Sequence, residues 1–485
     1  MSPNEFVHRS AVELQTRRFF LKTSMACVGG IAFNALLGRA FGDEATATAD
    51  GPRNQFPGKA KRVIYIHLAG APSHLETFDF KPELAKLDGK PCPESFLKGK
   101  RFAFLKGVPN MLGPQCQFSQ YGESGAWVCE HLPNIGKGAD DICFIKSMWT
   151  EQFNHAPAQL MVQTGSQLKG RPSVGSWVYY GLGTENHDLP GFIVLTSGGK
   201  NPDAGKTIWS SGFLPSIYQG VQCQTHGEPI LFARDPEGIT REQRRATIDA
   251  INAINQKTAK EFGDPETLTR ISQYELAFRM QMSVPEATDV SGEPEHIHKA
   301  YGTEPGKNSF ANNCLLARRL CERGVRFIQL YDWGWDAHGD MELTSLKGGH
   351  MRKLKVLDQA VSALLADLKQ RGLLKDTLVV CGAEFGRTPM KENRDGKDNP
   401  FAGRDHSPSG FTIWLAGGGV KGGLSYGETD DFGYEAIKDK VHVHDLNATL
   451  LHLLGFDHEK LIYTFQGRPY RLTDVHGKVV KEILA

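Results

Sequence analysis

The stretch Val379–His406 constrains the fold of this chain more than any other segment. It begins within a short apolar and largely β-branched run, Thr377–Val380, which predicts a buried strand. Glu384 follows this strand, and Asp405–His406 closes the polar loop before the next apolar run. Open α/β sheets bind ligands at the carboxyl ends of their strands, and carboxylate and imidazole donors suit a divalent metal. The alternative is a polar loop in which an aspartate and an arginine merely pair.

Two more predicted strands, Arg62–Leu68 and Val325–Tyr331, are also followed by acids and histidines. The candidate ligands after them are His74, Asp79, Asp336 and His338. Asp336 and His338 are two residues apart on an extended segment, so their side chains point the same way. Acid-and-histidine clusters thus recur at the same end of successive strands. This recurrence predicts a metal site, to which Glu384, Asp405 and His406 also contribute.

A nucleophile is a further candidate after the predicted strand Ile142–Met148. Thr150 and His155 follow this strand and precede a helical pattern that ends at Gly165. A hydroxyl at the start of a helix lies at the positive end of the helix dipole, and His155 could act there as general acid or base. A threonine cap with a buried histidine explains the pattern equally well.

Predicted helices and strands alternate in the second half of the chain. A helix over Asn312–Arg323 precedes the Val325–Tyr331 strand, and a long amphipathic helix over about 349–371 leads to the Val379 strand. This order indicates an α/β fold with parallel strands joined by crossovers. A helical stretch of mixed charge, about 240–285, is predicted to be an insertion.

The N-terminal sequence TRRFFLK, Thr16–Lys22, is followed by a mildly apolar run rich in glycine and alanine. Paired arginines before such a run are typical of a twin-arginine export signal. The run is too short and too glycine-rich for a stable membrane span. We therefore expect residues 1–45 to be a signal peptide and lead-in, and the mature protein to be periplasmic or extracellular without a membrane span. A basic N-terminal helix is the alternative, and it explains the order of these residues poorly.

Charge and cysteine content exclude two other classes. The formal net charge is +1, so nothing indicates a nucleic-acid partner. The nine cysteines form no CxxC pair and show no Cys/His zinc spacing, which argues against a structural zinc module.

A set of longer motifs resembles one family over nearly the whole mature chain. These motifs are SHLETFDFKP, TEQFNHAPAQ, WDAH, AEFGRTP, GRDH, GGLSYGETD and VHDLNATLLHLLGFDH. They resemble the DUF 1501 family, exported and sulfatase-like members of the alkaline phosphatase-like superfamily. The resemblance implies a domain over 60–485 with a three-layer αβα sandwich, a mostly parallel central sheet and insertions.

The resemblance also implies a nucleophile at the start of a helix, flanked by one or two divalent metals. The ion would be zinc, calcium, magnesium or manganese, held by aspartate and histidine at strand ends. Thr150 lies in the nucleophile region. Asp336 and His338 resemble one metal-binding pair, and His406 resembles the late histidine ligand.

The chain departs from the superfamily pattern at three points. The first strand ends in Ala69–Gly70 where an acid is usual, so that His74 or Asp79 would have to substitute. Phe385 follows Glu384 where a histidine ligand is common. No cysteine begins a Cys-x-Pro-Ser-x-Arg sequence, which excludes a formylglycine-dependent sulfatase.

The expected function is metal-dependent hydrolysis of phosphate or sulfate esters, on a small molecule or a polysaccharide. Arg387 or Arg404 would offset the charge of the transferring group as a planar fork matched to its oxygens. The competing hypothesis is a catalytically inactive exported module of the same fold, which binds a glycan or an envelope partner.

Overall fold

The structure, a computed structural model, describes residues 54–100, 102–223, 238–262, 265–394 and 396–485. The predicted signal peptide and lead-in, residues 1–45, lie outside the described residues. Among the helices of the described ranges, none combines the length and the apolar character needed to cross a membrane.

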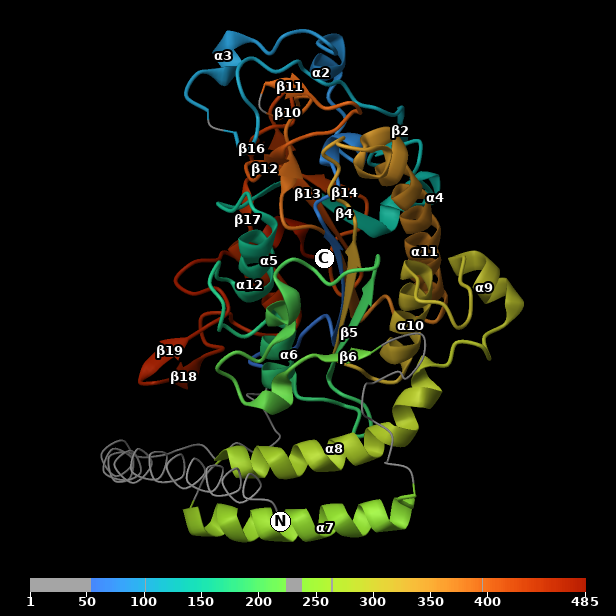
Figure 1. Cartoon of the computed structure of the whole chain (residues 1–485), viewed down its shortest axis with the longest axis vertical. Coiled ribbons are helices and arrows are strands. Elements are labelled where there is room, and N and C mark those ends of the chain that lie inside the picture. The colour runs from blue at the N-terminus through green and yellow to red at the C-terminus, as the bar shows by residue number, and fades with distance from the viewer. Residues whose placement is uncertain (1–53, 101, 224–237, 263–264, 395) are drawn as a thin grey trace, which may run out of the picture. The chain divides into compact units, whose positions relative to one another are not determined.

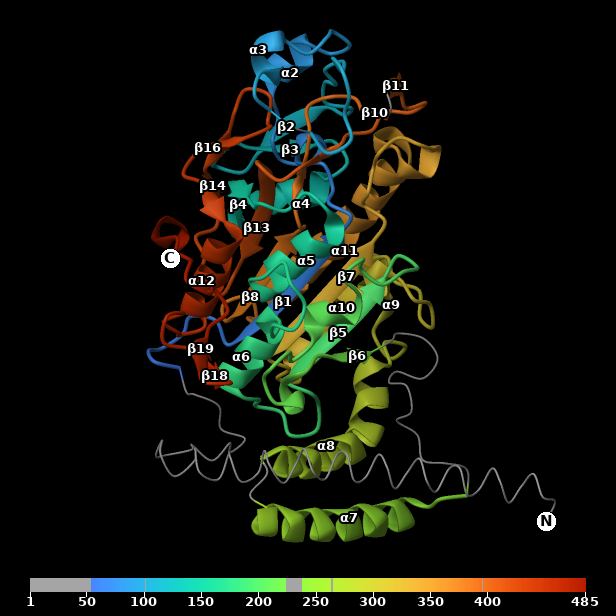
Figure 2. The same ribbon diagram turned by 60° about the vertical axis from the view of Figure 1, so that its left-hand side comes forward.

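A nine-stranded sheet runs through the described part of the chain (Figures 1 and 2). Eight strands lie in the order β14 (Leu424–Tyr426), β4 (Ile142–Trp149), β13 (Phe411–Ala416), β8 (Thr377–Gly382), β1 (Arg62–Ala69), β7 (Phe327–Trp333), β5 (Phe192–Ser197) and β6 (Val221–Cys223), and β17 (Val441–His442) pairs with β4. All pairs are parallel except the two that involve β13. The strands predicted from their apolar runs are therefore confirmed.

Helices cover both faces of this sheet, and alternate residues of β1 show the division. Val63 and Tyr65 belong to the core beneath α5 (His155–Thr164), α6 (Val174–Leu182) and α12 (Val443–Leu453). Ile64 and Ile66 belong to the core beneath α4 (Pro133–Lys137), α10 (Phe310–Glu322) and α11 (Met351–Gln370). Figure 1 shows α5, α6 and α12 on one side and α10 and α11 on the other. The predicted three-layer αβα sandwich with a mostly parallel sheet is confirmed.

The antiparallel direction of β13 determines at which edge of the sheet the loop with His406 lies. β13 runs antiparallel to both of its neighbours, β8 and β4. The residues before β13 therefore lie at the same edge of the sheet as the residues after β8. Beyond this edge, β9 (Gly386–Arg387) and β12 (His406–Ser407) form a short antiparallel pair.

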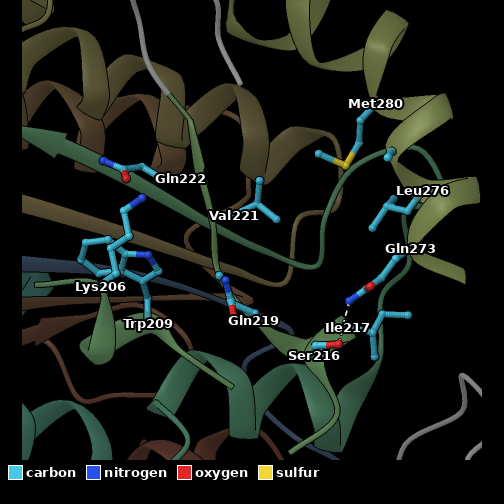
Figure 3. A pocket seen from close by; sticks show the side chains of 12 residues that line it. Lys206, Trp209, Ser216, Ile217, Gln219, Val221, Gln222, Gln273, Leu276 and Met280 are labelled. Atoms are coloured by element: carbon cyan, nitrogen blue, oxygen red, sulfur yellow. Dashed lines mark hydrogen bonds between the residues drawn. The ribbon is translucent and has the colours of Figure 1, made fainter. Parts of the chain in front are cut away.

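Two helices outside the sandwich occupy the stretch predicted as a helical insertion. They are α7 (Arg241–Phe262) and α8 (Pro265–Thr288), and Arg245 of α7 lies 2.6 Å from the Glu275 carboxylate of α8. A groove of about 430 Å³ separates α8 from the edge strand β6 (Figure 3). Gln273 donates a hydrogen bond of 2.8 Å to Ser216 Oγ at this groove.

Candidate metal centre

Four side chains converge beyond the carboxyl ends of β4, β7 and β8. They are His155, Asp336, His338 and His406, and one ligand atom from each lies within 4.8 Å of the others. His155 is the first residue of α5, which follows β4, while Asp336 and His338 follow β7. His406 reaches the same edge because β13 reverses the chain direction.

The distances within this cluster match those between the ligands of one ion. Asp336 Oδ1 lies 2.9 Å from His338 Nε2, 3.3 Å from His155 Nε2 and 3.5 Å from His406 Nε2. The Nε2 atoms of His338 and His406 are 3.2 Å apart. Ligands that bind zinc tetrahedrally at 2.0–2.1 Å are separated from one another by about 3.3 Å. Three imidazoles and one carboxylate therefore fit a divalent ion that accepts nitrogen and oxygen donors.

The second ring nitrogen of each histidine contacts a group that can only accept a proton. His155 Nδ1 donates to Glu384 Oε1 at 2.8 Å, and His406 Nδ1 donates to the Phe153 carbonyl at 2.7 Å. His338 Nδ1 donates to the Glu392 carboxylate. Such acceptors place the proton on Nδ1 and leave the Nε2 lone pair for a metal, an arrangement that metal-bound histidines commonly have.

The charges around the cluster also favour a cation. Asp336, Glu384 and Glu392 contribute three carboxylates, whereas Arg387 contributes one guanidinium, whose Nη2 lies 2.6 Å from Asp336 Oδ1. Within this group of four, neutral histidines leave a formal excess of two negative charges. A divalent cation would neutralise this excess.

Protons can take the place of the cation when no metal is bound. Burial disfavours the charged form of His155, but hydrogen bonds to Asp336 and Glu384 outweigh it and raise its pKa to about 9. The pKa of His338 is also raised, because its bonds to Asp336 and Glu392 outweigh its burial. Burial, aided by the charge of Arg387, lowers the pKa of His406 to about 3.

We therefore expect the affinity for a divalent metal to rise between pH 7 and pH 9. Below their raised pKa values, His155 and His338 hold protons that the metal must displace, so affinity should rise about tenfold per pH unit for each proton released. Above about pH 9 the competition from His155 ends. Calorimetric titration in two buffers of different ionisation enthalpy measures the protons released. An affinity that stays constant over this range would contradict the assignment of these histidines as ligands.

Two glycines allow the ligand segments to approach closely. Gly70 follows β1 with φ +104°, and a Cβ atom there would lie 2.7 Å from the Asp336 amide nitrogen. A Cβ atom on Gly403 would lie 2.0 Å from the His338 carbonyl carbon. Neither distance is sterically possible, so each position needs a residue without a side chain.

Glu384 and Asp405, both predicted as ligands, instead support the residues around the cluster. Glu384 is fully buried, and besides His155 it accepts hydrogen bonds from the Gly70 amide and from Gln159. Asp405 Oδ2 accepts the backbone N–H groups of Phe104 and Leu105 at 2.7 and 3.2 Å. Glu384 thus orients His155, whereas Asp405 holds a neighbouring loop.

The structure places His74 and Asp79, one of which was predicted to replace the missing acid after β1, with other partners. His74 Nε2 donates to the Gly433 carbonyl at 2.7 Å. Asp79 lies 3.2 Å from Lys81 Nζ and accepts a hydrogen bond from Thr429. Both are buried with these partners, and neither belongs to the four-residue cluster.

The two arginines predicted to contact the transferring group are both buried and paired with carboxylates. Arg404 is fully buried and forms a bidentate pair with Glu76, with a shortest distance of 2.6 Å. Arg387 is 1% exposed and contacts Asp336. Every nitrogen of the two guanidinium groups donates, and the backbone carbonyls that accept belong to Gly70, Ala71, Leu112, Gly113, Thr388 and Arg404. Both guanidinium groups are therefore fully engaged by protein acceptors.

Thr150 is tied to the segment that carries His406, since its N–H donates to the Pro408 carbonyl at 2.9 Å. Its Oγ1 is buried and has no hydrogen-bond partner among the described residues. Asn154 caps α5 and is exposed, and the residue of this helix that reaches the cluster is His155. His155 was predicted as acid or base, but both of its ring nitrogens face carboxylates, which gives it the geometry of a ligand.

Sequence reasoning missed Glu392, His67 and Phe104. Glu392 lies in the loop between Glu384 and His406. Its acidic side chain, close in sequence to the predicted ligands, could have marked it as a partner of a metal-binding histidine. His67 is fully buried on β1, and its Nε2 lies 3.1 Å from Glu384 Oε2. The Phe104 ring lies 5.5 Å from the His406 ring, and no local pattern marks this residue.

Comparisons with known proteins identify the family but not an activity. A family model described as "Protein of unknown function (DUF1501)" matches residues 60–484. No match was found among curated proteins.

Three solved structures illustrate how distant the structural neighbours are. The PsFucS1 sulfatase from Pseudoalteromonas sp. is 13% identical, with a TM-score of 0.36, over 82% of this chain and 68% of that one. The alkaline phosphatase from the Antarctic bacterium TAB5 is 12% identical, with a TM-score of 0.29, over 76% and 95%. The phosphonate monoester hydrolase from Silicibacter pomeroyi is 11% identical, with a TM-score of 0.31, over 82% and 73%. Such similarity assigns neither a reaction nor a substrate to this chain.

Proposed function

The chain belongs to the DUF1501 family, and we propose that it is an exported, metal-dependent hydrolase of phosphate or sulfate esters. The observation that carries the proposal is the convergence of three histidine Nε2 atoms on one oxygen of Asp336. The sequence TRRFFLK in the leader supports export.

His155, Asp336, His338 and His406 would hold the ion. A divalent ion bound there would act as a Lewis acid toward an ester oxygen. Glu384, Glu392 and the Phe153 carbonyl orient the three imidazoles, so that the ligands are arranged before the ion binds.

Two features of this chain suit attack on an anionic ester. The Thr150 hydroxyl is buried and has no partner among the described residues, and the Thr150 backbone N–H donates to Pro408, on the segment that carries His406. The N-terminus of α5 begins at the cluster with His155, and the positive end of a helix dipole favours an anionic group. Since Arg387 and Arg404 are occupied, the bound ion and this helix would offset the charge of the transferring group.

Replacing Thr150 with alanine is expected to lower ester turnover by at least about a hundredfold and to leave the metal content nearly unchanged. The mature protein is loaded in turn with zinc, calcium, magnesium and manganese. Metal content is then measured beside turnover of a panel of phosphate and sulfate esters. Thr412→Ala is a matched control, because it removes a hydroxyl of β13 that, like that of Thr150, has no hydrogen-bond partner among the described residues.

The outcomes separate three interpretations. Loss of turnover in the Thr150→Ala protein supports a threonine nucleophile. Full activity in this variant would assign the attack to water. No hydrolysis of any ester by the metal-loaded wild type would favour the inactive module that binds a glycan or an envelope partner.

A further inference from the structure

Large apolar side chains are exposed on the segments that meet at the candidate metal centre. Their exposed fractions are 36% for Phe104, 45% for Phe153, 54% for Met341, 69% for Leu343 and 42% for Phe401. We call these five residues the apolar rim. Soluble proteins expose single apolar residues freely, but a concentration of them at one site marks a binding surface.

Phe104 contacts the metal centre directly. Its ring meets the rings of His406 and His338 edge-on, with centroid distances of 5.5 and 6.0 Å. The backbone N–H groups of Phe104 and Leu105 donate to Asp405 Oδ2. Asn393 accepts from the backbone N–H of Lys106 and donates to its carbonyl. The backbone that carries the exposed ring is therefore held in place, which lowers the conformational entropy that a bound ligand would cost.

The other rim residues come from the segments on both sides of the ligands. The Phe153 carbonyl accepts the proton of His406 Nδ1. The Phe401 amide donates to the carbonyl of Gly339, the residue after His338, at 3.1 Å. Met341 and Leu343 follow Gly339 on the same segment. Leu343 lies within the short helix η5 (Glu342–Thr344), and Met341 directly precedes it. The rim thus includes residues from four separate segments of the chain.

Two polar side chains near Phe104, those of Asp405 and Asn393, are already engaged. Asp405 Oδ1 accepts a hydrogen bond from the backbone N–H of His406 at 2.7 Å. Its Oδ2 accepts those of Phe104 and Leu105. Asn393 uses both its oxygen and its nitrogen on Lys106. Phenylalanine, leucine and methionine side chains have no strong hydrogen-bonding group, whereas a sugar needs partners for its hydroxyls.

We propose that the organic group of the ester substrate is apolar, an aryl or long alkyl group that packs against Phe104 and the rest of the rim. This inference rests on the proposed hydrolase function and narrows its substrate class. Binding energy from such a remote group would position the ester at the metal centre.

The test compares phenyl and 2-naphthyl esters, whose leaving groups have similar acidity but different apolar area. The metal-loaded wild type is expected to prefer the 2-naphthyl ester by about fivefold in kcat/KM. Phe104→Ser should reduce this preference to nearly one, chiefly through KM, and should retain the metal. Leu168→Ser is the matched control, since it removes a 70% exposed side chain beyond the opposite end of α5 and should keep the preference.

Two results would overturn the inference while the hydrolase function stands. One is an unchanged preference in the Phe104→Ser protein, and the other is faster turnover of a hexose 6-phosphate or 6-sulfate than of either aryl ester. If the wild type hydrolyses no ester, the hydrolase function fails, and calorimetric binding of 2-naphthyl phosphate to the metal-loaded protein decides the inference. Binding that weakens about fivefold in Phe104→Ser supports the apolar site, and equal or absent binding rejects it.

Discussion

Replacing Asp336 with asparagine is expected to weaken metal binding by at least about a hundredfold, so that the protein purifies without metal. One oxygen of Asp336 faces the Nε2 atoms of three histidines and the guanidinium of Arg387. The amide has no net charge to offset a divalent ion. The same substitution removes the anion beside Arg387, which is 1% exposed, so the folded protein should also lose stability.

Asp340→Asn is the matched control for this substitution. Asp340 lies four residues further along the same loop and is exposed, so the change removes an equal charge from outside the cluster. Elemental analysis and metal titration of the two variants check the prediction. An Asp336→Asn protein that keeps the affinity of the wild type would show that the ion is not bound here.

The Arg404→Met substitution is expected to lower the free energy of unfolding by about 3–5 kcal/mol. Arg404 and Glu76 are both fully buried, and their closest atoms are 2.6 Å apart. Burial by itself would raise the pKa of the Glu76 carboxyl, but the Arg404 charge and its hydrogen bonds outweigh burial and lower it. Without Arg404, an ionised carboxylate is left in the core with no cation.

A double-mutant cycle separates this pairing from a role in catalysis. The Glu76→Gln, Arg404→Met double variant should be less destabilised than the sum of the two single variants, because no unpaired charge remains. Denaturant unfolding measures these differences, and Arg352→Met, which breaks an exposed pair with Glu342, should change stability little. If Arg404→Met retained full stability but lost ester turnover, Arg404 would be catalytic and our structural assignment would be wrong.

The α/β fold with parallel crossovers could be predicted from the sequence because its signals are local, and the family resemblance added the three-layer sandwich. β1 is apolar along nearly its whole length, as expected of a strand buried on both faces, and its residues alternate between two helical layers. The amphipathic α11 between β7 and β8 indicated the parallel crossover. Strand-end position also anticipated that Asp336 and His338 lie near His406, since side chains beyond the same edge of a sheet must approach one another.

The role of each polar residue depended on partners far along the chain. Glu384 meets His155 across 229 residues, and Glu76 meets Arg404 across 328. A local pattern does not encode such pairings. It could therefore not show that Glu384 orients a ligand, or that Arg404 forms a buried ion pair with Glu76. The charge and hydrogen-bonding capacity of these side chains were visible in the sequence, whereas packing decided which partner each one met.

The sequence by itself therefore determined the αβα sandwich, the family and the edge of the sheet where acids and histidines gather. Only the tertiary structure decided that His155 completes the cluster, that His74 and Asp79 lie outside it and that Phe104 covers its rings. The physical reason is the range of the forces involved. Apolar periodicity acts within one strand or helix, whereas a coordination site depends on sub-ångström placement of side chains from segments that the whole fold must bring together.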